Sequence, residues 1–155
     1  MKTCVLVLEN IRSVENTASI FRTAEGLGVS KIILVGTTPA PLDRFGRKRA
    51  DFAKVSLGAE ETIDWDYFND IDQVIESLEE QDFQIIALEQ TNESTKDIKN
   101  FKAQDKFALI VGNEVDGVSL RALKSSEATL EIPMRGKKES LNVSVATGIA
   151  LFVLI

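Results

Sequence analysis

Histidine is absent from the 155 residues of this chain. Without an imidazole the chain cannot build a Ser-His-Asp triad or a Cys-His pair, and it cannot bind zinc or iron through histidine. Proton transfer at an active site must therefore use a carboxylate, lysine, arginine, tyrosine, a substrate group or water. We expect no metal site.

Cysteine occurs once, at Cys4. A single cysteine excludes a disulfide within the chain and fits a reducing cytoplasm. Long apolar runs are lacking too. The run that starts at Val5 is too short for a signal peptide, and the last run, 141–155, is too short to span a bilayer and contains three polar residues. We therefore expect a cytoplasmic protein with no membrane segment.

Positive charge is in the minority, because 18 lysines and arginines stand against 24 acidic residues and give a formal net charge of −6. This balance argues against non-specific binding of nucleic acid, although a local basic patch could still bind it. Cations gather between Arg44 and Arg49, and again at Lys137 and Lys138. Two interpretations stay open: solvated loops, or together a basic rim around a functional site.

Five short and nearly continuous apolar runs predict buried strands. They lie at 4–8, 31–35, 83–88, 107–111 and 128–132. Helical periodicity and capping residues predict helices at 13–27, 50–57, 70–80 and 119–123, with a last helix from about 140 onward. This alternation predicts one α/β domain, residues 1–155, with a mostly parallel sheet and helices on both faces.

The C-terminal segment carries the clearest local signals. Pro133 ends the last strand because it cannot donate a backbone hydrogen bond. Ser140 or Asn142 is placed to cap the last helix. That helix is apolar nearly all round, so we expect it to be buried on most sides, in a core or in a subunit interface. Unpaired N–H groups at its start make its mouth a candidate ligand site.

Ligands of parallel sheets bind at the carboxyl ends of the strands. The candidate loops therefore follow Leu8, Leu88, Val111 and Ile132. No Walker-type loop is present, and no glycine-rich loop follows the first strand, which argues against ATP hydrolysis and a Rossmann dinucleotide site.

Polar residues in two of these loops each have two interpretations. Asn16 and Arg22 could both point to the strand-end side of their helix, or Asn16 could cap that helix while Arg22 is a solvated surface residue. Glu114 follows a buried strand, where a carboxylate needs a partner. The alternative for its loop is an ordinary strand-to-helix turn that Ser119 caps.

Three blocks together resemble motifs one, two and three of the SpoU, or TrmH-like, branch of the SPOUT RNA methyltransferases. They read NIRSVENTASIFRTAEGLG at 10–28, FALIVGNEVDGVS at 107–119 and IPMRGKKESLNVSVATGI at 132–149. They occur in the family's order and span nearly the whole chain. The resemblance implies an α/β SPOUT fold whose C-terminal part forms a deep trefoil knot. Unlike many ribosomal-RNA members of the family, the chain is expected to have no N-terminal RNA-binding extension, because it starts at the first predicted strand.

The resemblance also implies a reaction. S-adenosyl-L-methionine would donate a methyl group to a ribose 2′-hydroxyl of RNA, with tRNA favoured over rRNA, in a homodimer whose active site lies at the interface. The rival interpretation is a knotted RNA- or cofactor-binding protein without turnover.

By motif position, the resemblance assigns two sets of residues. The cofactor pocket would comprise Leu88, Glu89, Gly112, Ile132, Met134, Ser140 and Leu141. The catalytic set would comprise Asn16, Arg22, Glu114, Ser140 and Asn142. Since a guanidinium group keeps its proton in proteins, we interpret Arg22 as a clamp on phosphate and hydroxyl rather than as a base. Asn16 and Glu114 would orient it.

Overall fold

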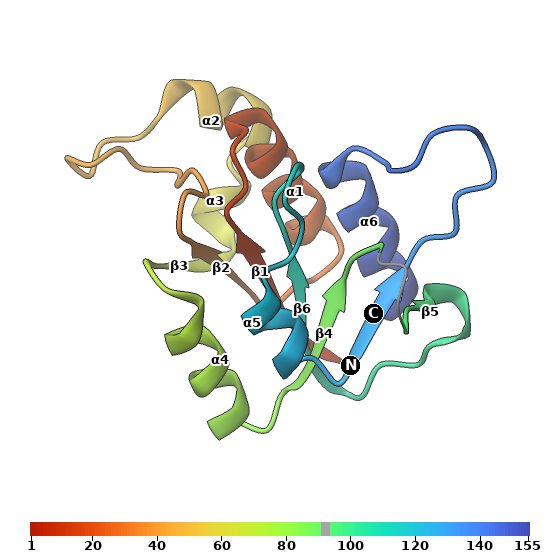
Figure 1. Cartoon of the computed structure of the whole chain (residues 1–155). Helices are drawn as coiled ribbons and strands as arrows, with labels where there is room; N and C mark the ends of the chain where they lie inside the picture. The colour runs from red at the N-terminus through yellow and green to blue at the C-terminus, as the bar shows by residue number, and fades with distance from the viewer. Residues whose placement is uncertain (91–93) are drawn as a thin grey trace.

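The computed structural model describes residues 1–90 and 94–155. Within them, seven strands form one sheet in the order β3-β2-β1-β6-β4-β7-β5, and every pairing is parallel. The strands are β1 (Thr3–Glu9), β2 (Lys31–Val35), β3 (Asp64–Phe68), β4 (Gln84–Leu88), β5 (Lys96–Asp97), β6 (Lys106–Val111) and β7 (Ala128–Glu131). The predicted parallel α/β architecture is confirmed (Figure 1).

The five predicted strands are the apolar ones, and the two that the sequence did not reveal lie at the edges of the sheet. β3 reads DWDYF and β5 reads KD. An edge strand has one free side and need not be apolar on both faces, so neither shows the apolar run of a central strand. Trp65, Tyr67 and Phe68 belong to β3.

The helices begin where short polar side chains cap them. Ser13 caps α1 (Val14–Gly26), Asp70 caps α4 (Ile71–Glu80) and Ser119 caps α5 (Leu120–Ser125). Asn142 caps α6 (Val143–Leu154), which decides between the two predicted caps and leaves Ser140 in the preceding loop. The remaining helices are α2 (Ala50–Ser56), α3 (Ala59–Thr62) and the 3-10 turn η1 (Ile98–Asn100).

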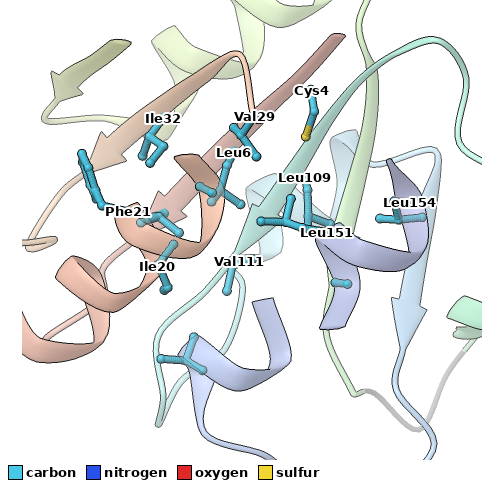
Figure 2. Packing of buried hydrophobic residues seen from close by; sticks show 14 of the residues in the cluster. Cys4, Leu6, Ile20, Phe21, Val29, Ile32, Leu109, Val111, Leu151 and Leu154 are labelled. Atoms are coloured by element: carbon cyan, nitrogen blue, oxygen red, sulfur yellow. The ribbon is translucent and has the colours of Figure 1, made fainter. Parts of the chain in front are cut away.

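Helices cover both faces of the sheet, as predicted. Side chains of the strands alternate between two clusters: Leu6 and Leu8 of β1 pack under α1, α2 and α6, whereas Val5 and Val7 face α4 and α5. Figure 2 shows the first cluster, where Leu151 of α6 lies near Leu109 of β6. Each fully buried aliphatic or aromatic side chain contributes about 1.5–3 kcal/mol relative to an exposed one.

The last helix, α6, is not buried on most sides within one chain. Ala150, Leu151 and Leu154 pack into the core, but Phe152 is 77% exposed and Val145 50% exposed. Ile149, Val153 and Ile155 are exposed as well. Of the two predicted alternatives, burial in the core therefore accounts for one face of α6 only, and burial of the other face in a subunit interface stays a prediction. In the described part of the chain, no helix is long and apolar enough to cross a bilayer.

Candidate active site

A pocket of about 390 Å³ opens at the carboxyl ends of β4, β6 and β7. Its wall is formed by the residues that follow these three strands and by the first turn of α6. Small-molecule sites range from about 300 to 1,000 Å³. The pocket therefore has the size of a small-ligand site, and it lies where parallel sheets bind ligands.

All seven residues predicted for a cofactor lie in this one wall. They are Leu88, Glu89, Gly112, Ile132, Met134, Ser140 and Leu141. The wall combines apolar side chains with a carboxylate and backbone groups, a mixture that suits a ligand with an aromatic ring and polar substituents. The wall also contains Gln90, Val111, Asn113, Gly117, Glu131, Val143 and Ala146, which the sequence did not reveal. All of these except Gly117 and Ala146 are next in sequence to a predicted site residue. That adjacency is the signal that could have identified them.

The turn after β6 is built on two glycines. A Cβ atom on Gly112 would lie 2.4 Å from the backbone of Gly117, and Gly117 has φ +71°, in the left-handed region that favours glycine. Asn113 closes the turn, because its side-chain oxygen accepts from Val115 N at 2.7 Å and from Asp116 N at 3.0 Å. This tight turn holds Glu114 at the mouth of the pocket.

Two other carboxylates, those of Glu89 and Glu9, accept hydrogen bonds from the end of the same loop after β6. Glu89 accepts from Val118 N at 2.7 Å, and Glu9 accepts from Ser119 N at 2.9 Å and from Ser119 Oγ at 2.7 Å. Glu9 is only 2% exposed, whereas Glu114 is exposed. The carboxylate that needs a buried partner is thus Glu9 and not Glu114, and the apolar run before it gave no sign of this role.

Three residues of the predicted catalytic set meet at the pocket mouth. Asn142 Nδ2 donates to Asn16 Oδ1 at 3.1 Å, and Asn16 Nδ2 makes a longer contact of 3.4 Å with Glu114 Oε1. Asn142 Oδ1 also accepts from Ser144 N at 2.9 Å as the cap of α6. The fold thus joins one residue from each of the three sequence motifs. Asn16 does not cap its helix, because Ser13 does.

Arg22 lies elsewhere. It lines an open groove between α1 and α6 with Ser19, Thr23, Gly26, Leu27, Gly148 and Phe152. Within the described residues, no hydrogen bond joins Arg22 to Asn16 or Glu114, so the expected orientation of Arg22 by these two residues does not occur inside one chain. Residues 16 and 22 are six positions apart, which turns them to different sides of α1.

The two basic segments do not form one rim in a single chain. The loop containing Arg44 to Arg49 follows β2 and lies at the left in Figure 1, whereas the segment with Lys137 and Lys138 follows β7 and lies at the right, toward the other end of the row of strands. Three strands separate β2 from β7, which corresponds to about 19 Å at the usual strand spacing.

Comparison with known proteins places this arrangement in a family. The family model of the SpoU rRNA Methylase family matches residues 3–152, nearly the whole chain. The chain belongs to the SpoU rRNA Methylase family. A curated SpoU relative, the 23S rRNA (guanosine-2'-O-)-methyltransferase RlmB of Vibrio vulnificus (strain CMCP6), is 31% identical over 96% of this chain and 57% of that protein. This SpoU chain therefore spans little more than half the length of such relatives.

Solved structures share the SpoU chain's fold. An AdoMet-bound rRNA methyltransferase from Sinorhizobium meliloti superposes with a TM-score of 0.86 at 27% identity, over 97% of this chain and 55% of the other. The TrmH/SpoU tRNA modifying enzyme of A. aeolicus gives a TM-score of 0.84 at 25% identity, over 99% of this chain and 74% of the other. The predicted SPOUT type of fold agrees with both likenesses.

Proposed function

We propose that this chain is an S-adenosylmethionine-dependent RNA 2′-O-methyltransferase domain that works as a homodimer. The observation that carries the proposal is the junction of the three family motifs. Asn16, Glu114 and Asn142 come from segments far apart in sequence and meet at the mouth of one pocket. Family membership and relatives named as RNA ribose methyltransferases support the chemistry.

The residues of the pocket fit the cofactor. Leu88, Ile132, Met134 and Leu141 offer an apolar surface for an adenine ring, and Glu89 offers a carboxylate. The cofactor, when bound, supplies the methyl group. A similar fold that carries AdoMet in a solved structure supports this assignment. The chain's own contribution is to hold its loops in place, since the glycine turn and Glu9 fix the wall before any ligand arrives.

Arg22 requires a second subunit in this proposal. It faces the groove between α1 and α6, outside the pocket of its own chain, and the apolar face of α6 is exposed beside it. A symmetric dimer would cover that face and bring the partner subunit's Arg22 to the pocket. There Asn16 and Glu114 would orient it, and it would clamp the phosphate and the ribose hydroxyl of the substrate.

The RNA substrate is proposed as rRNA first and tRNA second. The sequence alone favoured tRNA, but the 31% identical Vibrio relative is named for 23S rRNA, and that support outweighs the tRNA modifying enzyme at 25% identity. Both kinds of RNA present a ribose hydroxyl, so the pocket does not discriminate between them.

The trefoil knot is part of the same proposal. The segment after β7 and the segment after β4 line one pocket together, which is the arrangement that a threaded C-terminal tail would produce. A crystal structure in which the tail runs beside the loops without passing through one would contradict it.

A labelling experiment tests the function. The chain is incubated with methyl-labelled S-adenosylmethionine and, separately, with purified 23S rRNA, 16S rRNA and total tRNA. We expect label on one ribose of rRNA, located by nuclease digestion and mass spectrometry. Label on a base would contradict the proposed reaction, and cofactor binding without transfer to any RNA would favour the binding protein without turnover.

A further inference from the structure

The loop between β2 and α2, residues 36–49, carries an exposed aromatic tip. Figure 1 shows this loop as the orange segment that projects beyond α2. Phe45 at the tip is 67% exposed. Within the described residues the exposed phenylalanines are Phe45 and Phe152, and only Phe45 stands among cations.

Two arginines lie against this ring. Arg44 Cζ is 4.8 Å and Arg47 Cζ is 5.0 Å from the centre of the Phe45 ring. A guanidinium group over an aromatic face is attracted by the ring quadrupole, and both groups can also stack on bases and bind phosphate. The tip thus combines an exposed aromatic ring with two guanidinium groups, one of which, Arg47, is also paired with Asp43.

The tip is ordered by its own chain. The Asp43 carboxylate accepts from Phe45 N at 2.8 Å, from Arg47 N at 3.0 Å and from Arg47 Nε at 2.9 Å. These bonds, led by the one from the Arg47 backbone, lower the pKa of Asp43. A β-bridge between Leu42 and Lys48 closes the loop behind them. The aromatic side chain is therefore presented on a preformed turn, which reduces the entropy lost on binding.

The base of the loop is tied to the candidate active site. Asn10, with φ +54°, accepts from Thr37 N at 3.1 Å through its side chain, and its carbonyl accepts from Asn113 Nδ2 at 2.8 Å. Asn113 closes the turn that holds Glu114. Because all strands are parallel, the loop leaves the same edge of the sheet as the pocket, and two strand spacings, about 10 Å, separate β2 from β6.

We propose that Arg44, Phe45 and Arg47 form a contact site for a single-stranded nucleotide of the RNA substrate, distinct from the nucleotide that is methylated. The base stacks on Phe45 and the phosphate lies against the guanidinium groups. This inference rests on the proposed RNA-modifying function. A chain of net charge −6 cannot hold RNA by a general positive field, so a local stacking and cation site supplies the missing attraction.

The test separates stacking from charge. A fluorescein-labelled single-stranded RNA of mixed sequence is titrated by anisotropy at several salt concentrations, and cofactor affinity is measured on the same samples to confirm folding. Phe45→Leu should weaken RNA binding about 5- to 100-fold at every salt concentration. Arg44→Gln should reduce the slope of log affinity against log salt by about 0.7.

Two variants serve as controls. Phe45→Trp keeps a stacking surface, so it should bind like the wild type, with quenching of the new indole by RNA. Lys124→Gln removes one exposed cation on α5, at the other face of the sheet, and should change neither affinity nor slope.

Equal binding by the wild type and Phe45→Leu would overturn the site and leave the tip to another ligand class, such as a protein. Equal loss in Phe45→Leu and Phe45→Trp would overturn stacking. If the wild type methylates no RNA, the proposed function fails instead, which the labelling experiment shows independently.

Discussion

The two sides of α1 differ in how complete they are within one chain. On one side, Asn16 lies in a closed set of contacts with Asn142 and Glu114, beside a pocket whose loops are fixed by buried or glycine-dependent contacts. On the other side, Arg22 lies in an open groove next to Phe152, which is 77% exposed. One region is preorganised by its own chain, whereas the other presents apolar surface to solvent.

This difference indicates where the proposed second subunit would contribute. A pocket whose loops are fixed within one chain gains little stability from a partner. An exposed apolar helix face would be buried by a partner, and the arginine beside it would find a group of opposite charge there. The proposed composite site follows from this asymmetry, and the experiments below can break or sharpen it.

The largest effect is expected from Arg22→Ala. Removing a positioned cation that acts on the reacting hydroxyl should lower the rate of methyl transfer about 100- to 1,000-fold. Cofactor affinity should stay within about twofold, since the proposed contacts of Arg22 are with the phosphate and hydroxyl of the RNA and not with the cofactor. Single-turnover transfer and calorimetric titration of the cofactor measure the two quantities. A similar loss of both would remove Arg22 from the proposed role.

A mixed dimer decides which subunit supplies the arginine. One chain of the heterodimer carries Arg22→Ala, and the other carries Ala146→Phe, which fills that chain's pocket. The heterodimer is purified through a different tag on each chain. The open pocket of the Arg22→Ala chain then receives the intact arginine of the other chain. We expect about half of the wild-type rate, because one of the two symmetric sites is restored. A heterodimer as inactive as both parent variants would show that the arginine acts within its own chain.

Phe152→Glu should dissociate the proposed dimer. A buried aromatic side chain contributes about 1.5–3 kcal/mol and the two-fold axis repeats it, so the dissociation constant should rise about 100-fold or more. Sedimentation equilibrium measures it. Leu120→Glu is the matched control, because Leu120 is 74% exposed on α5 and introduces the same charge on the opposite face of the sheet. Equal dissociation by both variants would point to general charge repulsion rather than to this helix face.

Asn142 combines two contacts that two substitutions can separate. Asn142→Ala removes both the cap of α6 and the bond to Asn16, so the free energy of unfolding should fall by about 1 kcal/mol. Asn142→Asp keeps a capping oxygen but loses the donated N–H. The Asn142→Asp variant should keep the wild-type free energy of unfolding, measured in urea. Its rate of methyl transfer should fall about tenfold, because one hydrogen bond to Asn16 is lost. Full activity in Asn142→Asp would make the contact with Asn16 incidental.

Sequence reasoning succeeded where burial dictates residue type. The five inner strands are apolar because both faces of a parallel sheet are covered, and the residues at their ends necessarily share one edge, so the pocket wall followed from the motifs. It was less informative where an element has an uncovered side. β3 and β5 pair on one side only and were missed, α6 was left open between a core and an interface, and spacing along α1 could not tell which surface Arg22 joins. Glu9 was missed because a carboxylate at a strand end gives no sign of its distant partner, Ser119.

The smallest expected effect is the pH dependence of stability that comes from Cys4. This residue lies in the hydrophobic core beneath both sides of α1. Its thiol is 1% exposed, and burial raises its pKa from 9.0 to about 12, with Lys2 acting weakly in the other direction. Since the unfolded chain loses this proton first, the stabilisation is complete below about pH 9 and is lost as the pH rises toward 12. Urea unfolding of the wild type and Cys4→Ala at a series of pH values should show a steeper decline for the wild type in that window and parallel curves at neutral pH.

The same thiol tests whether the two regions are independent. Only the thiolate reacts, so at pH 8 a disulfide reagent should modify Cys4 through opening of the fold. With opening fast relative to modification, Asn142→Ala should react about fivefold faster, in proportion to its lost cap. Phe152→Glu, compared at concentrations where both proteins are monomeric, should react like the wild type, because its side chain lies outside the core that holds Cys4. Faster reaction of Phe152→Glu would mean that the outer face of α6 supports the core, and the contrast between a self-sufficient pocket and a partner-dependent groove would fail.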